Sequence, residues 1–189
     1  NDESMLTYFA NLASGMSMQY GLGASLFNLN RELNSLIDNT EISQQSVYQR
    51  LVLVDYDGTV IADTEKNPDT AFDKVNMPHI HEQSLTIRIV QDGKSPYIQL
   101  VKRVQYAGKP VAFLVADLNR KVIISQLTAQ EDADSRSRMD LITADGDIFI
   151  WDSLTTKLQA DDKNVLANKI YFEMEIENTP FKLRSWFEP

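Results

Sequence analysis

Three strand-like runs with very short connections lie between residues 85 and 118, and they restrict the fold more than any other feature. The two connections, DGKSP and AGK, are hairpin-sized. Parallel strands need a crossover of about a dozen residues or more, so these runs can pair only in antiparallel fashion. The sequence therefore predicts an antiparallel sheet with strands at Leu85 to Gln91, Tyr97 to Tyr106 and Val111 to Leu118.

An Asp-Gly pair between two strand-like runs occurs twice. The first copy, LVLVDYDGTVIADT, spans residues 51 to 64, and the second, LITADGDIFIWDS, spans residues 141 to 153. Asp-Gly between apolar runs is a strong signal for a β-hairpin. We expect Asp57 and Gly58 to form the first turn, and Asp55 to stabilise that turn from the end of the preceding strand.

Residues 4 to about 48 carry a helical pattern, in which leucines recur every three or four positions. Gly15, Gly21 and Gly23 weaken the middle of this segment, because glycine lowers helix stability. The pattern fits a helix laid across a sheet, two shorter helices, or a stalk helix that also forms a dimer seam. The leucines concerned are Leu22, Leu26, Leu29, Leu33 and Leu36.

Together these elements predict an α+β fold. A long N-terminal helix occupies residues 1–48, and a five-stranded antiparallel module with a short helix at its end occupies 49–130. A smaller β module over 131–189 opens with the second Asp-Gly hairpin and closes with the strands KIYFEMEIE and PFKLRSWFE. The long polar segment 64–84 is typical of a functional loop.

Composition excludes several functional classes. The formal net charge is -9 and no Lys/Arg-rich run is present, so we expect neither nucleic acid nor an anionic membrane surface as a partner. The chain has no cysteine, which excludes thiolate metal sites, and no cofactor is expected. No apolar run approaches the roughly 20 residues of a membrane-spanning helix. Since the sequence begins at Asn1 rather than Met, we expect it to be part of a longer protein.

The DYDGT sequence at residues 55 to 59 also matches the opening motif of haloacid-dehalogenase-type phosphatases. In that chemistry Asp55 is the nucleophile, and Asp57 is the acid that protonates the leaving group. That fold is a doubly wound parallel sheet with a crossover after each strand, which the hairpin-sized connections contradict. The phosphatase is therefore the alternative hypothesis, and we expect a protein that is not an enzyme.

The helix, the hairpin VLVDYDGTVIADT and the stretch YIQLVKRVQYAGKPVAFLVADLN together resemble the Cache (PDC, PAS-like) sensor domains of bacterial transmembrane receptors. The resemblance implies a long helix packed on a PAS-like five-stranded antiparallel sheet, followed by a short membrane-proximal module. It implies a periplasmic domain that binds a small molecule and signals along the helix. The output module would belong to a histidine kinase, a chemoreceptor or a diguanylate cyclase.

The resemblance also implies the partners. They are a small molecule, such as a small carboxylate or another polar metabolite, and a second copy of the chain that joins through the N-terminal helix. The Y-x-x-x-x-R-x-W-Y signature of amino-acid-binding members is absent, so an amino-acid ligand is not supported. A module that binds a partner protein and holds no ligand is a further alternative.

In such domains the ligand lies on the sheet, near the long loop. If Gly108 and Lys109 form a two-residue turn, Asp117 shares a face with Lys102 and Tyr106, which gives a carboxylate and an ammonium over an apolar floor. A three-residue turn shifts the register by one residue and reverses the faces. That register would present Tyr97, Gln99 and Arg103 instead. Asp117 alternatively caps the helix that follows it.

Three further residues are candidates for the ligand site. Arg88, within the apolar run LTIRIV, is either an anion-binding residue or a solvent-facing residue on an alternating strand. His79 and His81 lie in the sequence HIHE of the long loop, where no third well-spaced metal ligand accompanies them. They could tune a pH response at the mouth of the pocket, or they are solvated loop residues. No metal site is expected.

Overall fold

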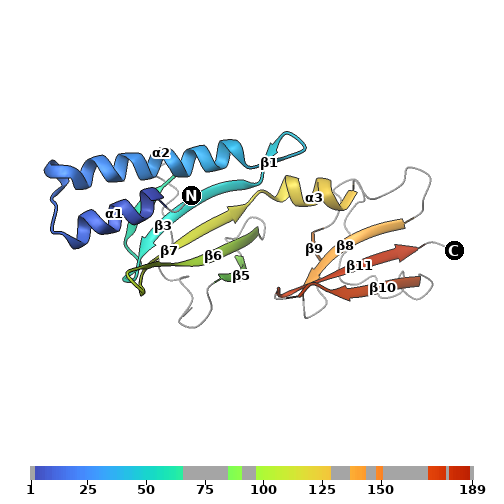
Figure 1. The fold of residues 1–189 in the computed structure, drawn as a ribbon. Coiled ribbons are helices and arrows are strands. Elements are labelled where there is room, and N and C mark those ends of the chain that lie inside the picture. The colour runs from blue at the N-terminus through green and yellow to red at the C-terminus, as the bar shows by residue number, and fades with distance from the viewer. Residues whose placement is uncertain are drawn as a thin grey trace. The chain divides into compact units, whose positions relative to one another are not determined.

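The computed structural model describes residues 3–65, 85–90, 97–128, 137–143, 148–150, 170–177 and 179–187 (Figure 1). The chain divides into two compact units, the first formed by Asn1–Gln91 with Tyr97–Asn119 and the second containing Arg120–Pro189. Helices and antiparallel sheets make up both, and the predicted α+β class is confirmed. The predicted boundaries at residues 48 and 130 stay predictions for the domain organisation.

The N-terminal segment forms two helices rather than one, so the single helix over residues 4 to 48 is wrong and the alternative of two shorter helices is confirmed. α1 spans Glu3–Ala13, and α2 spans Gly23–Asn39 after the short π-helical segment η1 (Met18–Leu22). α1 ends because Gly15 adopts a φ of +76°, which glycine tolerates best. The amide of Gly15 then donates to the Leu12 carbonyl and that of Met16 to the Asn11 carbonyl, the pattern of a Schellman cap.

α2 also ends earlier than the sequence predicts. Its last residue is Asn39, and a small hairpin follows, in which β1 (Glu41–Ile42) pairs with β2 (Gln45–Ser46). The apolar positions of the helix end at Leu36 and Ile37, which pack against the core, and the polar residues Asp38, Asn39 and Thr40 follow. Here a turn with positive φ at Ser43 and Gln44 replaces the helix.

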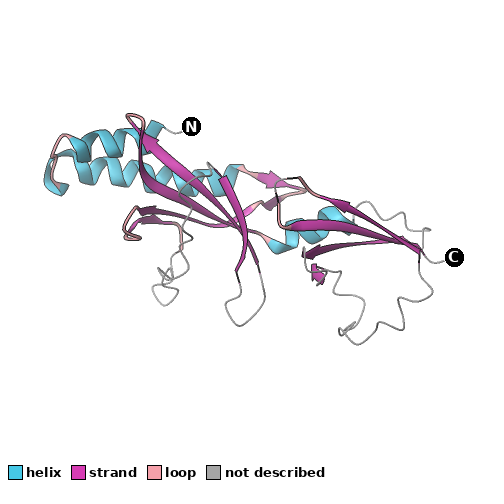
Figure 2. Cartoon of the chain, turned by 90° about the horizontal axis from the view of Figure 1, so that it is seen from below, coloured by secondary structure: helices cyan, strands magenta, loops and turns pink. Residues whose placement is uncertain are grey.

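A five-stranded antiparallel sheet forms the centre of the first unit, with the strand order β4-β3-β7-β6-β5. Every pairing in it is antiparallel, as the short connections predict, which is not the doubly wound parallel sheet of the phosphatase alternative. Figure 2 shows α1 and α2 side by side. The strands span Tyr48–Asp55 (β3), Val60–Asp63 (β4), Leu85–Val90 (β5), Tyr97–Tyr106 (β6) and Lys109–Leu118 (β7).

The main core of the first unit lies between the two helices and one face of this sheet. Alternate residues of the strands face the helices, because successive side chains of a strand point to opposite faces. From α2, Leu29 and Leu33 are 1% and 3% exposed, and they belong to one cluster with Leu51 and Leu53 of β3. Residues that alternate with these, such as Arg50 and Val52, point to the opposite face of the sheet.

The second unit contains α3 (Arg120–Thr128) and a four-stranded antiparallel sheet of order β10-β11-β8-β9. The predicted strands of the smaller module are confirmed where the structure describes them. They span Ser137–Thr143 (β8), Ile148–Ile150 (β9), Ile170–Glu175 (β10) and Phe181–Phe187 (β11). The second Asp-Gly pair, Asp145 and Gly146, lies outside the described residues.

Candidate functional site

The connection between β6 and β7 decides which side chains share a face with Asp117. Ala107 and Gly108 form the turn with φ of 50° and 76°, and a bulge lies at Val104 and Gln105, just before the turn. Asp117 consequently lies opposite Gln99. The predicted turn at Gly108 and Lys109 is wrong by one residue. Moving a two-residue turn by one position changes the pairing by two residues and keeps the faces, so it is the bulge at Val104 and Gln105 that reverses them. The face that the three-residue turn would present is the one that the structure has.

A row of polar residues crosses four strands of the sheet at this level. Arg50 of β3 lies opposite Asp117 of β7, Asp117 lies opposite Gln99 of β6, and Gln99 lies opposite Arg88 of β5. Directly opposed residues of antiparallel strands point to the same face, so the four side chains lie side by side. We call Arg50, Asp117, Gln99 and Arg88 the polar row.

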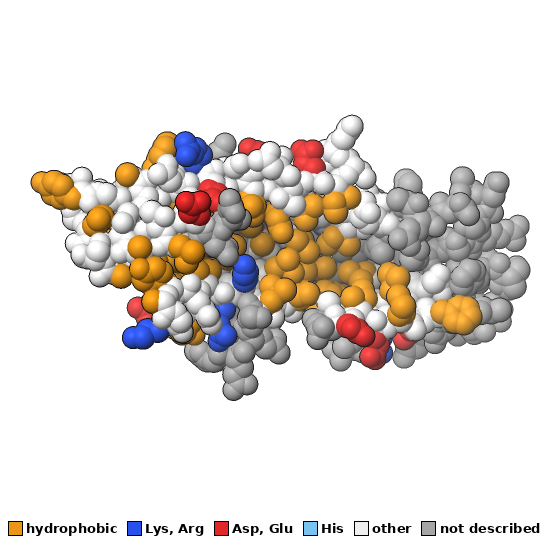
Figure 3. All heavy atoms as spheres, viewed as in Figure 1, with side chains coloured by type: hydrophobic (Ala, Val, Ile, Leu, Met, Phe, Trp, Pro, Cys, Tyr) orange, Lys and Arg blue, Asp and Glu red, His pale blue; other side chains and the backbone are white. Residues whose placement is uncertain are grey.

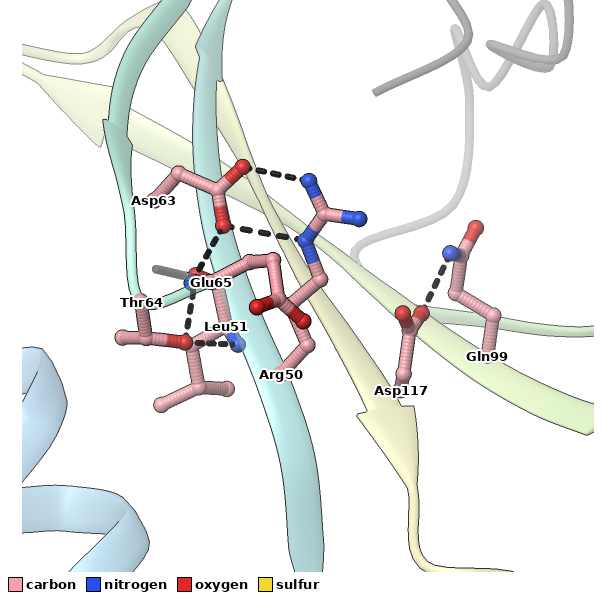
Figure 4. Close-up of polar contacts among 7 residues, drawn as sticks. All are labelled: Arg50, Leu51, Asp63, Thr64, Glu65, Gln99 and Asp117. Atoms are coloured by element: carbon pink, nitrogen blue, oxygen red, sulfur yellow. Dashed lines mark hydrogen bonds and ion pairs between the residues drawn. The ribbon is translucent and has the colours of Figure 1, made fainter. Parts of the chain in front are cut away.

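Hydrogen bonds join three members of the polar row. Nε of Arg88 donates to Oε1 of Gln99 at 2.6 Å, and Nη2 of Arg88 donates to the same oxygen. Nε2 of Gln99 donates to Oδ1 of Asp117 at 2.6 Å (Figure 4). Arginine can only donate and an ionised carboxylate can only accept, so both neighbours dictate the same orientation of the Gln99 amide. Gln99, which is 2% exposed, thus links a cation to an anion.

The fourth member, Arg50, forms an ion pair with Asp63 of β4. Its Nε and Nη2 donate to the two carboxylate oxygens at 2.9 and 2.5 Å, the two-pronged geometry that favours arginine over lysine (Figure 4). The backbone amide of Glu65 also donates to Asp63, at 2.9 Å. At the same edge, the Leu51 amide donates to the Thr64 hydroxyl at 2.8 Å. Asp63 is therefore fixed, and it holds Arg50 beside Asp117.

Next to the polar row, the same sheet face is apolar. Its residues are 4% exposed or less, and together they form a hydrophobic cluster separate from the helix-side core. Phe113 is also stacked on the Tyr56 ring, with the ring centroids 5.0 Å apart. A few polar groups beside an apolar floor are typical of a small-molecule site. The floor consists of Val52, Val54, Val101, Phe113 and Val115.

Burial shifts the protonation equilibria of the polar row. The pKa of Asp117 is raised, mainly because burial penalises the carboxylate, while the Gln99 hydrogen bond and the charges of Arg50 and Arg88 oppose this effect. Burial lowers the pKa of Arg88. For Arg50 the hydrogen bond to Asp63 dominates and raises the pKa. A partly buried carboxylate beside guanidinium groups is common at functional sites.

The predicted site residues separate into three groups. Arg88 and Asp117 lie together in the polar row. Lys102 lies opposite Leu114 and is exposed, and Tyr106 packs against the helix-side core, so neither shares the face of Asp117. Their assignment as ligand-binding residues rested on the register that is wrong. His79 and His81 lie outside the described residues.

Sequence reasoning missed two residues of this arrangement, Arg50 and Asp63. Arg50 stands at the start of an apolar strand and Asp63 near the end of a hairpin, where charged residues are ordinary. Only their placement on adjacent strands, with Arg50 opposite Asp117, reveals the pair. Gln99 was available from sequence, but only in the alternative register. Oδ1 of Asp117 accepts from the side chain of Gln99, and the helix-capping role stays an alternative prediction.

The residues of the phosphatase motif form a turn. Oδ1 of Asp55 accepts hydrogen bonds from the amides of Asp57 and Thr59 at 3.0 and 2.7 Å, and Gly58 has a φ of +79°. The predicted role of Asp55 in stabilising this turn is confirmed. Asp57 is exposed to solvent.

Two features are absent from the residues that the structure describes. No group of three or more His, Asp or Glu side chains there is arranged to hold a metal ion. Within the same ranges, no helix combines the length and the apolar character that a membrane span requires.

Comparison with known proteins gives matches in structure alone. No protein-family model matches the sequence, and no curated protein matches it. The sensor domain of the Vibrio cholerae histidine kinase DctB superposes with a TM-score of 0.60 and 14% identity, over 97% of this chain and 84% of that one. The ligand-binding domain of the Pseudomonas aeruginosa amino-acid chemoreceptor PctC, in complex with GABA, gives 0.58 and 10%, over 86% and 80%.

A domain of a sensory box/GGDEF family protein from Vibrio parahaemolyticus also matches, with a TM-score of 0.58 and 10% identity, over 98% of this chain and 85% of that one. The chain has the fold of receptor sensor domains. The predicted resemblance to Cache domains is thus confirmed for the fold, and identities of this size carry no further than the fold.

Proposed function

We propose that this chain is the extracytoplasmic sensor domain of a bacterial transmembrane receptor, and that it binds a small molecule on the polar row. One observation carries the proposal: four strands bring Arg50, Asp117, Gln99 and Arg88 into register beside an apolar floor. If this face of the sheet served only for packing, apolar residues would suffice, and a hydrogen-bonded row of polar side chains would not be needed. The fold supports the same proposal, because the structures that share it include sensor domains of a histidine kinase and a chemoreceptor.

The ligand we propose is a small polar metabolite that carries a carboxylate and a hydrogen-bond donor such as an ammonium group. Oδ1 of Asp117 accepts from Gln99, which leaves Oδ2 for a donor of the ligand. Arg88, whose Nε and Nη2 donate to Gln99, supplies positive charge beside this position, and positive charge favours a carboxylate on the ligand. GABA, the molecule bound in the PctC domain, carries both groups. A dicarboxylate would satisfy only the cationic part of the row.

The two faces of β3 and β7 connect this site to the helices. Arg50 and Asp117 belong to the polar row, whereas the adjacent Leu51 and Ala116 belong to the helix-side core together with Leu29 of α2. A ligand that favours one arrangement of these strands therefore favours one position of the helix. It can shift the equilibrium only by its difference in affinity for the two arrangements.

The proposal describes a binding domain without catalytic activity that works as a homodimer through the N-terminal helices. The helices keep several large apolar side chains exposed, among them Leu6 at 42% and Phe27 at 67%, and apolar side chains are visible at the end where α1 and α2 join (Figure 3). Sedimentation of the chain and of a Phe27→Gln variant tests the dimer. A monomer at every concentration would remove that part of the proposal.

Thermal unfolding in the presence of candidate ligands tests the binding site. We expect GABA-like zwitterions to raise Tm more than succinate or n-butylammonium, since only the zwitterions satisfy Arg88 and Asp117 together. Asp117→Asn should abolish the Tm increase, because it removes the anion while keeping the hydrogen bond to Gln99. Asp57→Asn, which removes the same charge from an exposed turn, is the matched control and should retain it.

A Tm increase of the same size in Asp117→Asn would refute the polar row as the site. No increase with any compound would favour the module that binds a partner protein. Turnover of p-nitrophenyl phosphate with Mg²⁺, lost in Asp55→Asn, would restore the phosphatase.

A further inference from the structure

A cavity of about 570 Å³ lies on the helix side of the first unit, on the opposite face of the sheet from the polar row. Its walls come from α1, from α2, from the β3–β4 turn and from the β6–β7 turn. Figure 1 shows these two turns at one end of the sheet next to α1, and Figure 3 shows apolar side chains gathered there. The volume falls within the range of about 300 to 1,000 Å³ that is usual for small-molecule pockets.

Aromatic residues from α1 and β6 form part of the walls of this cavity. Tyr8 and Phe9 of α1 are 8% and 4% exposed and meet edge to face, with ring centroids 5.2 Å apart. Tyr106, which packs against the helix-side core, supplies a third ring from the end of β6. Tyr56 also lines the cavity, but its ring is stacked on Phe113 of the opposite face. The faces of such rings attract cations, most strongly where water is displaced.

The charge of the cavity wall has one sign. Asp55 is its charged lining residue, and no Lys, Arg or His lines it among the residues that the structure describes. Oδ1 of Asp55 accepts the two turn amides, and Oδ2 has no hydrogen bond in the described part of the chain. The Asp55 charge reaches Tyr8, where it adds to burial in raising the pKa of the phenol. Asp55 thus adds an anionic residue to a wall in which the structure describes no cationic one.

We propose that this cavity is a second binding site, which takes a small organic ammonium ion. The ammonium group would lie against the carboxylate of Asp55, and the carbon part of the ion would lie against the rings of Tyr8, Phe9 and Tyr106. A carboxylate without a ring wall would bind inorganic cations equally well, and a ring wall without a carboxylate would bind neutral compounds. The combination selects a cation with an apolar body.

This second site does not depend on the polar row. The two sites lie on opposite faces of the sheet and share no residue. The cavity is also built partly from α1 and α2, so an ion bound there contacts the helices directly. Occupation of the cavity would therefore stabilise one position of the helices against the turns.

Titration of the ¹⁵N-labelled chain with benzylammonium and, separately, with benzyl alcohol tests the proposal by NMR. The two compounds have the same ring and nearly the same size, and only the first is charged. We expect saturable shifts at the amides around residues 8, 55, 106 and 111 with benzylammonium, and binding at least about tenfold weaker with benzyl alcohol, as expected for loss of a charged hydrogen bond.

Three variants locate the binding. Asp55→Asn keeps an oxygen for the turn amides and should weaken benzylammonium binding by about tenfold or more. Asp57→Asn, the matched control in the same turn, and Asp117→Asn in the polar row should leave the affinity unchanged. Absence of saturable binding by the unaltered chain, equal affinity for benzyl alcohol, or an equal loss in Asp57→Asn would overturn the proposal. A loss confined to Asp117→Asn would assign the ion to the polar row and also overturn it.

Discussion

The two faces of the five-stranded sheet are made by the same strands but have opposite characters. On one face, Leu51 and Leu53 alternate into a core that α1 and α2 cover. On the other, Arg50 stands next to Val52 and Val54, and a hydrogen-bonded polar row crosses the strands. Hydrophobic burial is non-directional, whereas a hydrogen-bonded row requires fixed geometry. The helix face thus supplies most of the buried apolar core, and the polar face holds the hydrogen-bonded groups on which the proposed ligand site rests.

The helix face should show the largest effect of a single substitution on stability. Leu29→Ala removes a side chain that is 1% exposed between α2 and the sheet, and we expect the free energy of unfolding to fall by about 2–5 kcal/mol. Urea unfolding followed by circular dichroism measures it. Phe27→Ala, two residues away on the same helix and 67% exposed, is the control and should change stability little. A small loss in Leu29→Ala would show that the helix does not depend on this core.

An intermediate effect is expected on the polar face. Gln99→Ala removes the amide that links Arg88 to Asp117, so we expect the free energy of unfolding to fall by about 1–3 kcal/mol and ligand-induced stabilisation to disappear. Gln105→Ala changes an exposed glutamine of the same strand and should change neither quantity. If Gln99→Ala lowers stability but leaves ligand binding intact, ligand binding does not depend on the polar row.

The smallest effect concerns the pH dependence of stability. Burial raises the pKa of Asp117 in the folded chain, whereas Asp in the unfolded chain has a pKa of about 3.9. Folding therefore favours the protonated form of Asp117. The contribution of Asp117 to stability is therefore fully present below that pH and is lost as the pH rises through the folded pKa. Lowering the pH from 7 to 4 should raise the stability of the wild type relative to Asp117→Asn. Urea titrations across this range measure the difference, and a constant or falling difference contradicts the expected shift.

The fold was largely predictable because its signals are local. Short connections between residues 85 and 118 allow only antiparallel pairing, and the Asp57-Gly58 turn with its Asp55 hydrogen bonds lies within five consecutive residues. The break in the helix was visible in part, since Gly15 ends α1 where the sequence already shows a weak point. The end of α2 was harder to predict from the sequence, because Ser and Gln, unlike Gly or Asn, do not favour the positive φ that Ser43 and Gln44 adopt.

The candidate site was only partly predictable, because it depends on register. Asp117 and Arg88 were identified as polar residues in apolar strands, yet their partners follow from a turn at Ala107 and Gly108 and a bulge at Val104. No residue in QYAGKPV marks the bulge. A shift of one residue exchanged Lys102 for Gln99 beside Asp117, and no local pattern connects Arg50 to a strand more than sixty positions away.

We propose above that a small molecule binds on the polar row. The most direct measurement is an NMR titration of the ¹⁵N-labelled chain with the zwitterion that raises Tm most. If the polar row is the site, the zwitterion should cause saturable chemical shift changes centred on the amides of residues 50, 88, 99 and 117. Asp117→Asn should abolish these changes, and Asp57→Asn should keep them. Saturable shifts confined to residues 8, 55, 106 and 111 instead, and unaffected by Asp117→Asn, would contradict the proposal.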